Sequence, residues 1–273
     1  MKFLKIVGLL LAGSMICLMA GCAKKADADV LMREAKANAN AIQSCTATIN
    51  STLEFNANGK QNTFKTGNEI VYWAKPFAMK STQSSLLGGT TGNSVSYTVT
   101  DSKGVWFYSE SGGAWQKTAA GNTGTAPLEQ VDILGLLDSV SGQKYVREMT
   151  LGSQKVHKLE LTFRSEVLRS TVENIVTATG MAQGSQTIVQ TLLDSAPAIY
   201  GYCYIDQSSG QIVRIELDVT DIVNKIFQDI EGSDITVAVS KCSISGDISN
   251  IGKAPAVELP PQAAAAQTVQ AAG

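Results

Sequence analysis

The sequence has few of the residues from which catalytic and metal sites are built. It holds one histidine, His157, and five cysteines among 273 residues, and 17% of its residues are charged. No two cysteines have the C-x-x-C spacing and no cysteine–histidine cluster occurs, so we expect no structural zinc site and no metal. The formal net charge is −2, without a basic tract, which argues against a nucleic-acid partner.

Motifs of nucleotide-binding and hydrolytic enzymes are also missing. The sequence contains no GxSxG, no phosphate-binding loop and no dinucleotide fingerprint. His157 alternates in phase with Leu159 and Leu161, which is typical of a packed side chain on a strand. Carboxylate pairs such as Glu216 and Asp218 are typical of the solvated face of a strand. We therefore expect neither an enzyme nor a cofactor.

The longest uncharged apolar run is too short to span a membrane. It covers residues 6–20, about 15 residues where a spanning helix needs roughly 20. It follows Lys2 and Lys5 and ends at Ala20-Gly21-Cys22, the layout of a secretory signal. The stretch LMAGC at residues 18–22 resembles the lipobox of bacterial lipoproteins. Two alternatives remain: a cleaved signal in which Cys22 is incidental, and an uncleaved anchor.

The lipobox predicts that residues 1–21 are removed and that Cys22 carries the lipid. The mature chain then loses Lys2 and Lys5 and no acidic residue, so its formal net charge falls from −2 to −4. Residues 22–29 form an acylated tether, in which Lys24 and Lys25 lie beside the membrane surface. The expected location is extracytoplasmic and lipid-anchored to the cell membrane, or to the outer membrane in a Gram-negative cell.

Three cysteines remain in the mature domain: Cys45, Cys203 and Cys242. Outside the cytoplasm, two of them can form a disulfide and leave one thiol. Their spacing does not define a bridge, so the sequence leaves open one disulfide or three buried apolar side chains.

Hydrophobic periodicity predicts a helix over residues 30–43, with Asp29 as its N-cap, and then a change from period 3.6 to period 2. Strands are expected at 45–55, 61–74, 77–83, 94–100, 105–109, 114–117, 144–150, 154–163, 199–206, 211–221 and 235–248, with residues 87–93 as a loop. A parity switch between Val239 and Cys242 predicts a bulge. Short connections between the strands predict an antiparallel sheet. Helical segments are expected at 127–139, 165–195 and 222–230.

These elements predict one α+β domain over residues 30–260, followed by an Ala/Gln-rich tail at 261–273 that we expect to be disordered. The order of elements resembles the LolA/LppX-like group of lipoprotein and lipid carriers, and within it the lipoproteins of Gram-positive type. The resemblance is carried by NAIQSCTATI at 40–49, GVWFY at 104–108, GAWQK at 113–117, the hairpin 199–217 and the ending 250–260.

The resemblance implies a strongly curved antiparallel sheet, a half-barrel, whose concave face is covered by helices and holds acyl chains. The implied function is a membrane-anchored protein that binds a lipid or lipopeptide, with the membrane as its partner through the N-terminal lipid. The candidate groove residues are the apolar side chains expected on the inner face: Ile49, Leu53, Phe55, Ile70, Leu159, Leu161, Ile215 and Leu217.

An alternative function needs no cavity, because a lipid-lined groove and a packed core use the same side chains. In that case the chain is a cell-surface interaction or adaptor module. Its contact surface would be the outer face of the sheet or the tyrosine ladder Tyr200, Tyr202 and Tyr204, which shares one face of a strand opposite Ile199, Cys203 and Ile205.

Overall fold

The computed structural model describes residues 26–87, 90–119, 135–169, 185–194, 198–228 and 237–268. The expected lipid-attachment residue Cys22, the pair Lys24 and Lys25, and the expected helical residues 127–134, 170–184, 195 and 229–230 lie outside the described residues.

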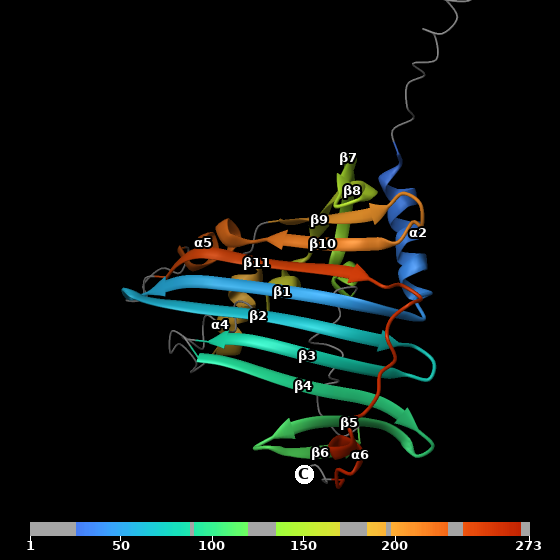
Figure 1. Cartoon of the computed structure of the whole chain (residues 1–273). Coiled ribbons are helices and arrows are strands. Elements are labelled where there is room, and N and C mark those ends of the chain that lie inside the picture. Colours follow the sequence, from blue (N-terminus) through green and yellow to red (C-terminus); the bar gives the residue numbers. More distant parts are fainter. Residues whose placement is uncertain are drawn as a thin grey trace, which may run out of the picture.

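Eleven strands form one antiparallel sheet (Figure 1). Their order across the sheet is β6-β5-β4-β3-β2-β1-β11-β10-β9-β8-β7, so the ends β6 and β7 do not pair and the sheet is not closed. The first six strands are β1 Ser44–Ala57, β2 Lys60–Trp73, β3 Ala78–Leu87, β4 Thr90–Asp101, β5 Gly104–Ser111 and β6 Ala114–Ala119. The others are β7 Val140–Leu151, β8 Gln154–Phe163, β9 Ile199–Asp206, β10 Ile212–Asp218 and β11 Val237–Ser249.

Short turns explain this order. The pairs β1–β2, β4–β5, β5–β6 and β7–β8 are each joined by a two-residue turn, and neighbours joined this way must be antiparallel. The long strand β11 returns beside β1 and joins the two halves of the sheet. The α+β class and the curved antiparallel sheet predicted from the sequence are thereby confirmed.

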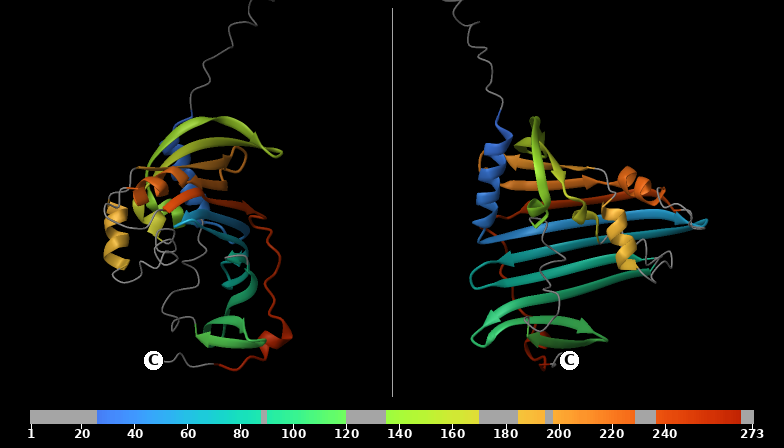
Figure 2. Two further views of the ribbon diagram at one scale, coloured as in Figure 1. Left: turned by 90° about the vertical axis from the view of Figure 1, so that its left-hand side faces the viewer. Right: turned by 180° about the vertical axis from the view of Figure 1, so that it is seen from behind.

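The helices are short and lie mainly on one side of the sheet, which curves around them (Figure 2). They are α2 Ala28–Asn40, the 3-10 helices η2 Gly135–Ser139 and η3 Ser165–Leu168, α4 Ser185–Asp194 and α5 Thr220–Gln228. We call the face toward them the inner face; it carries Leu53, Leu159 and Ile215. The outer face carries Val71, Tyr97 and Tyr204.

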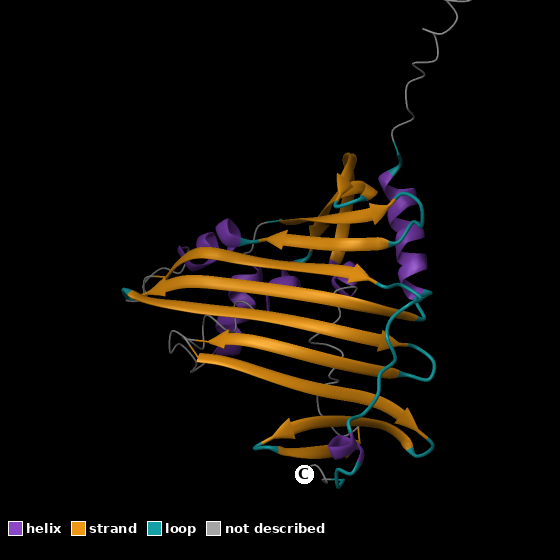
Figure 3. Cartoon of the chain, in the orientation of Figure 1, coloured by secondary structure: helices purple, strands orange, loops and turns teal. Residues whose placement is uncertain are grey.

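The C-terminal residues cross the outer face. Residues 251–268, which we call the C-terminal strap, run from the end of β11 to β6 and include α6 Pro261–Ala264 (Figure 3). Trp73 Nε1 donates a hydrogen bond to the carbonyl of Pro255 at 2.8 Å, and Thr268 pairs with Lys117 in a parallel bridge. Ala263 is fully buried against Tyr97 and Tyr108.

Residues 261–268 are thus ordered where the sequence predicts disorder. A run of alanines has no alternation of apolar and polar residues from which a helix or strand could be predicted. The aromatic side chains that order this segment belong to β4 and β5, which are distant in the sequence.

Two other expectations are corrected. The N-cap of α2 is Asp27, which accepts from the backbone N–H groups of Asp29 and Val30. The expected loop at 87–93 is shorter, because β4 begins at Thr90.

The predicted bulge in the last strand is confirmed. Glu54 pairs with Lys241 and Phe55 with Val239, so Ser240 is the extra residue. The hydroxyl of Ser240 donates to the carbonyl of Glu54 at 3.1 Å. A second irregularity lies between Ile212 and Arg214, and it turns Val213 away from Ile215 toward the outer face, where it packs with Val156 and Tyr204.

Candidate functional site

The structure places the candidate groove residues on the inner face. The main core contains six of them, each at most 7% exposed: Leu53, Phe55, Leu159, Leu161, Ile215 and Leu217. Ile70 is buried in a smaller cluster with Ala47 and Met79, and the half-buried Ile49 contacts both clusters. The sheet therefore brings together six of the eight, and Ile49 links them to Ile70.

Each helix on the inner face buries one or two apolar side chains in the main core. Leu137 of η2, Leu168 of η3, Leu193 of α4, and Val223 and Phe227 of α5 are all buried in the main core. At the other end of the strands, Met32 and Ala35 of α2 are buried in the same core. No described helix exceeds 13 residues, a length at which an isolated helix is marginal in water, so contact with the apolar face keeps this cover folded.

Helix α5 is fixed to the sheet by hydrogen bonds. Asn224 exchanges two of them with the backbone of Val239, at 2.5 and 2.6 Å. The hydroxyl of Thr220 accepts from the backbone N–H of Cys242 at 2.8 Å. Asn224 and Thr220 thus bond to backbone groups of β11 that lie beyond the last residue paired with β10. Helix α5 takes the place of a neighbouring strand there.

Helix α4 is held in a different way. Its main contacts within the described residues are with η3 and α5, not with a strand. A polar chain joins it to the end of η3: Arg169 Nη2 donates to Gln190 Oε1 at 3.0 Å, and Gln190 Nε2 donates to Asp194 Oδ1 at 2.7 Å. All these groups are exposed to solvent, where such bonds contribute little. α4 is therefore a described helix with few direct contacts to the strands.

The inner face changes character across the sheet. The row of inner-face residues that runs from Leu159 through Cys203 and Ile215 to Ile49 has no polar side chain. On β2, β3 and β4 the same row continues as Asn68, Gln83 and Ser94. Ser81 donates to Asn68 at 2.8 Å and is buried. The largest continuous apolar surface thus lies over β1 and β8–β11.

The three cysteines are buried side chains of the main core. Cys45 pairs with Tyr72, Cys203 with Ile215 and Cys242 with Leu53, so no two of the three occupy adjacent register positions. Of the two readings that the sequence leaves open, three buried apolar cysteines is the one observed. Burial raises the pKa of the Cys203 thiol to about 12, because the thiolate would be fully desolvated.

The three tyrosines of the ladder share one face of β9, as predicted, and that face is the outer one. They lie within a polar network that the sequence did not reveal. The Tyr204 hydroxyl donates to Glu216 Oε2 at 2.7 Å, and Arg214 Nε donates to Asp247 Oδ1 at 2.6 Å. Lys158 Nζ lies 3.5 Å from the centre of the Tyr202 ring. Burial and then the hydrogen bond to Glu216 raise the pKa of Tyr204. Only Tyr200, 52% exposed, presents an open ring.

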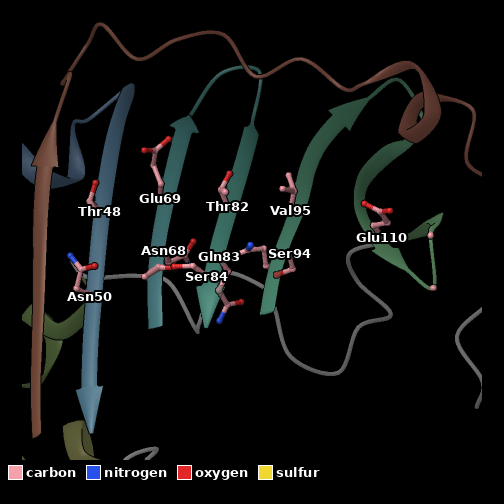
Figure 4. Close-up of a pocket in the computed structure, with 14 residues that line it drawn as sticks. Thr48, Asn50, Asn68, Glu69, Thr82, Gln83, Ser84, Ser94, Val95 and Glu110 are labelled. Carbon is pink, nitrogen blue, oxygen red and sulfur yellow. The ribbon is translucent and has the colours of Figure 1, made fainter. Parts of the chain in front are cut away.

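A shallow polar pocket of about 610 Å³ crosses the outer face of β1–β5 (Figure 4). Thr48, Glu69, Thr82 and Val95 occupy one row across four strands, and Glu110 follows on β5. None of the eight groove candidates lines it. Most of its polar residues come from the positions that alternation assigns to the solvated face, and Asn68, Gln83 and Ser94 of the inner-face row also line it. Alternation along one strand does not indicate that residues of different strands are neighbours.

His157 is a packed side chain, as expected. Its side chain is 16% exposed, its ring lies 5.9 Å from that of Tyr145, and Nδ1 lies 4.0 Å from Glu148 Oε1. Within the part of the chain that the structure describes, no group of three His, Cys, Asp or Glu residues is arranged to hold a metal ion. In that same part, no helix has the length and apolarity needed to cross a membrane.

No protein-family model and no curated protein matches the sequence. Among solved structures, the chain is similar to the lipoprotein LppX of Mycobacterium tuberculosis, with a TM-score of 0.45 and 14% identity, over 84% of this chain and 97% of that one. It is similar to LprF from Mycobacterium bovis, with a TM-score of 0.45 and 10% identity, over 85% and 95%.

A third similarity is to an outer membrane lipoprotein-sorting protein domain from Vibrio parahaemolyticus, with a TM-score of 0.25 and 8% identity, over 82% of this chain and 92% of that domain. No ligand and no residue role is carried over from these proteins, and the site is assigned from the side chains of this chain alone.

Proposed function

We propose that this protein is an extracytoplasmic lipoprotein, anchored through Cys22, that binds a lipid or acylated ligand between the inner face of its sheet and the covering helices. The proposal rests on how the helices cover the inner face of the sheet. An open sheet with a wide apolar face is covered by short helices that each bury one or two apolar side chains against it, and α4 among them rests mainly on η3 and α5.

The described arrangement is then the closed state, in which protein side chains fill the site. An acyl chain and an aliphatic side chain bury the same kind of surface, at about 25 cal/mol per Å². A ligand that displaces Leu193 of α4 keeps the inner face covered, so opening loses little apolar burial. The chain is bound over β1 and β8–β11, and Asn68, Ser81 and Gln83 limit the apolar surface toward β3 and β4.

The anchor limits what such a protein does. A chain tethered at Cys22 stays within reach of one membrane, because stable anchoring takes more than one acyl chain and a lipoprotein carries several. Binding and release therefore occur beside the membrane surface. Transfer to a distant acceptor would require the acceptor to come to the tether.

Native mass spectrometry of the C22S chain tests the ligand directly. This variant lacks the anchor lipid, so any lipid mass that remains belongs to the fold. We expect retained lipid, or saturable uptake of an apolar fluorescent probe after the protein is stripped with detergent. A folded, stripped protein that takes up neither would refute the proposal.

A further inference from the structure

A second pocket, of about 850 Å³, lies at the end of the strands where three segments meet. These are the β7–β8 turn with Lys155, the β9–β10 turn at residues 206–211, and the start of the C-terminal strap with Lys253. Val213 on its wall packs with the outer-face cluster, whereas Ile248 and Ile251 belong to the edge of the main core. None of the eight groove candidates lines this pocket, so it borders the main core without including the acyl-binding residues.

Two lysines of this pocket have no carboxylate partner. Among the described residues, no ion pair involves the side chain of Lys155 or that of Lys253, and both residues are exposed. The pocket's carboxylate, Asp206, is occupied by its own turn: its Oδ1 accepts from the backbone N–H and the hydroxyl of both Ser208 and Ser209. These four donors hold Asp206 in its ionised form within the turn, and the two lysines against this one carboxylate leave the lining with a positive formal charge.

One lining group is buried without a partner. The Oε1 atom of Gln211 is shielded from solvent and makes no hydrogen bond. An orphaned buried acceptor of this kind destabilises the fold, and a hydroxyl or N–H donor of a ligand that reaches it removes that cost. The side chains of Gln154 and Gln207 add further donors at the rim.

The pocket also lies beside the helix that follows the tether. Asn38 of α2 donates to the carbonyl of Gly210 at 3.0 Å, and Figures 1 and 2 show α2 along this end of the strands. A group bound here is therefore on the side of the molecule where the chain enters the fold.

We infer that this pocket binds a phosphate ester that also carries a hydroxyl or amine donor. The phosphate lies between Lys155 and Lys253, and the donor reaches Gln211 Oε1. Two sources have this chemistry: the head group of an anionic phospholipid, and a soluble phosphate ester. The site does not depend on acyl binding at the inner face, so either proposal can fail while the other holds.

The test uses the C22S chain labelled with ¹⁵N. Inorganic phosphate, glycerol 3-phosphate and glycerophosphoglycerol are titrated while the Gly210 amide and the Gln211 side-chain amide are followed by NMR. Binding to vesicles of phosphatidylcholine with and without phosphatidylglycerol is measured in parallel. We expect saturable shifts at these two residues, and we expect K155Q/K253Q to weaken binding at least tenfold. The matched control is K60Q/K241Q, which removes the same charge at the opposite end of the sheet.

Gln211→Leu separates a binding role from a structural one. The substitution removes the orphaned acceptor, so it should raise the melting temperature of the free protein while it lowers the affinity for glycerol 3-phosphate. Binding confined to vesicles and glycerophosphoglycerol assigns the site to a lipid head group, and binding of glycerol 3-phosphate assigns it to soluble esters. Absence of saturation by about 20 mM of every probe, far weaker than a specific site requires, would overturn the inference. An equal loss in the control pair would overturn it as well.

Discussion

Phe55 of β1 and Phe64 of β2 stack across the inner face, with ring centroids 5.9 Å apart and planes 4° from parallel. Phe55 is fully buried in the core, whereas Phe64 is only partly buried. The stack therefore marks where the covered part of the inner face gives way to a more open part. A ligand that enters from the side of β2 meets Phe64 first.

Phe64→Ala should weaken acyl-probe binding several-fold and lower the free energy of unfolding by about 1–3 kcal/mol, less than for a fully buried phenylalanine. Urea unfolding measures the second effect and probe fluorescence the first. Val105→Ala, at a residue that is 38% exposed on β5, is the control and should change neither. Equal effects of the two substitutions would show that Phe64 does not contribute to acyl binding.

Much of this arrangement follows from the sequence, because period 2 identifies which residues share a face before the fold is known. The alternation from Cys45 to Phe55 assigns the inner face of β1, and the parity switch near Ser240 indicates the bulge. Periodicity does not identify neighbours across strands. The proximity of Lys158 to Tyr202, and of Arg214 to Asp247, depends on a strand order that only the folded sheet reveals.

The C-terminal strap is a second feature that the sequence pattern does not reveal. Ala263 sits in a run of alanines that carries no pattern, yet it is fully buried against Tyr97 and Tyr108. Its order is imposed by aromatic residues more than 150 positions earlier in the chain. A local reading of composition therefore assigns it to a disordered tail.

Removing the strap should loosen one end of the sheet. A chain that ends at residue 256 loses the residues that cover Tyr97 and Tyr108, so hydrogen exchange should accelerate in β4–β6 and stay slow in β8–β11. The matched control ends at residue 268 and keeps every described strap contact. Uniform acceleration in all strands would show instead that the strap stabilises the whole domain.

Tyr204→Phe removes a hydrogen bond to a charged, partly buried acceptor. Glu216 retains Arg214 at 3.4 Å, so we expect a loss of about 1–2 kcal/mol in the free energy of unfolding. Tyr200→Phe should stay within about 0.5 kcal/mol, because that ring is exposed. A double-mutant cycle with Glu216→Gln checks whether the loss belongs to this pair; additive effects would exclude the coupling.

Burial of Cys203 makes stability depend on pH in the alkaline range. The thiol has its pKa raised from 9.0 to about 12, so the unfolded chain loses this proton at a lower pH than the folded protein. The stabilising contribution is complete below pH 9 and is lost at up to about 1.4 kcal/mol per pH unit above it. Urea titrations of the wild type and Cys203→Ala between pH 8 and about 10.5 measure the difference. Parallel slopes for the two proteins would contradict the predicted shift.

The hydrogen bond from Arg169, at the end of η3, to Gln190 of α4 should control how fast a ligand reaches the inner face. Arg169→Ala removes the donor to Gln190 and should speed probe uptake several-fold with little effect on unfolding, because these groups are exposed. Asn224→Ala acts on α5 and should instead cost stability, since it leaves the backbone of Val239 without partners. Stopped-flow fluorescence resolves the rates. Unchanged uptake in R169A would exclude α4 as the moving element.

The central claim is that an acyl chain binds at the inner face, and photolabelling measures this residue by residue. The C22S chain is loaded with a fatty acid that carries a diazirine on its acyl chain, irradiated, digested and sequenced by mass spectrometry. The predicted labels fall on inner-face residues of β1 and β8–β11, such as Leu53, Phe55, Leu161 and Leu217, and are lost when unlabelled fatty acid competes. Labels that gather instead on the outer face, at Tyr200 or along the C-terminal strap, would contradict the account.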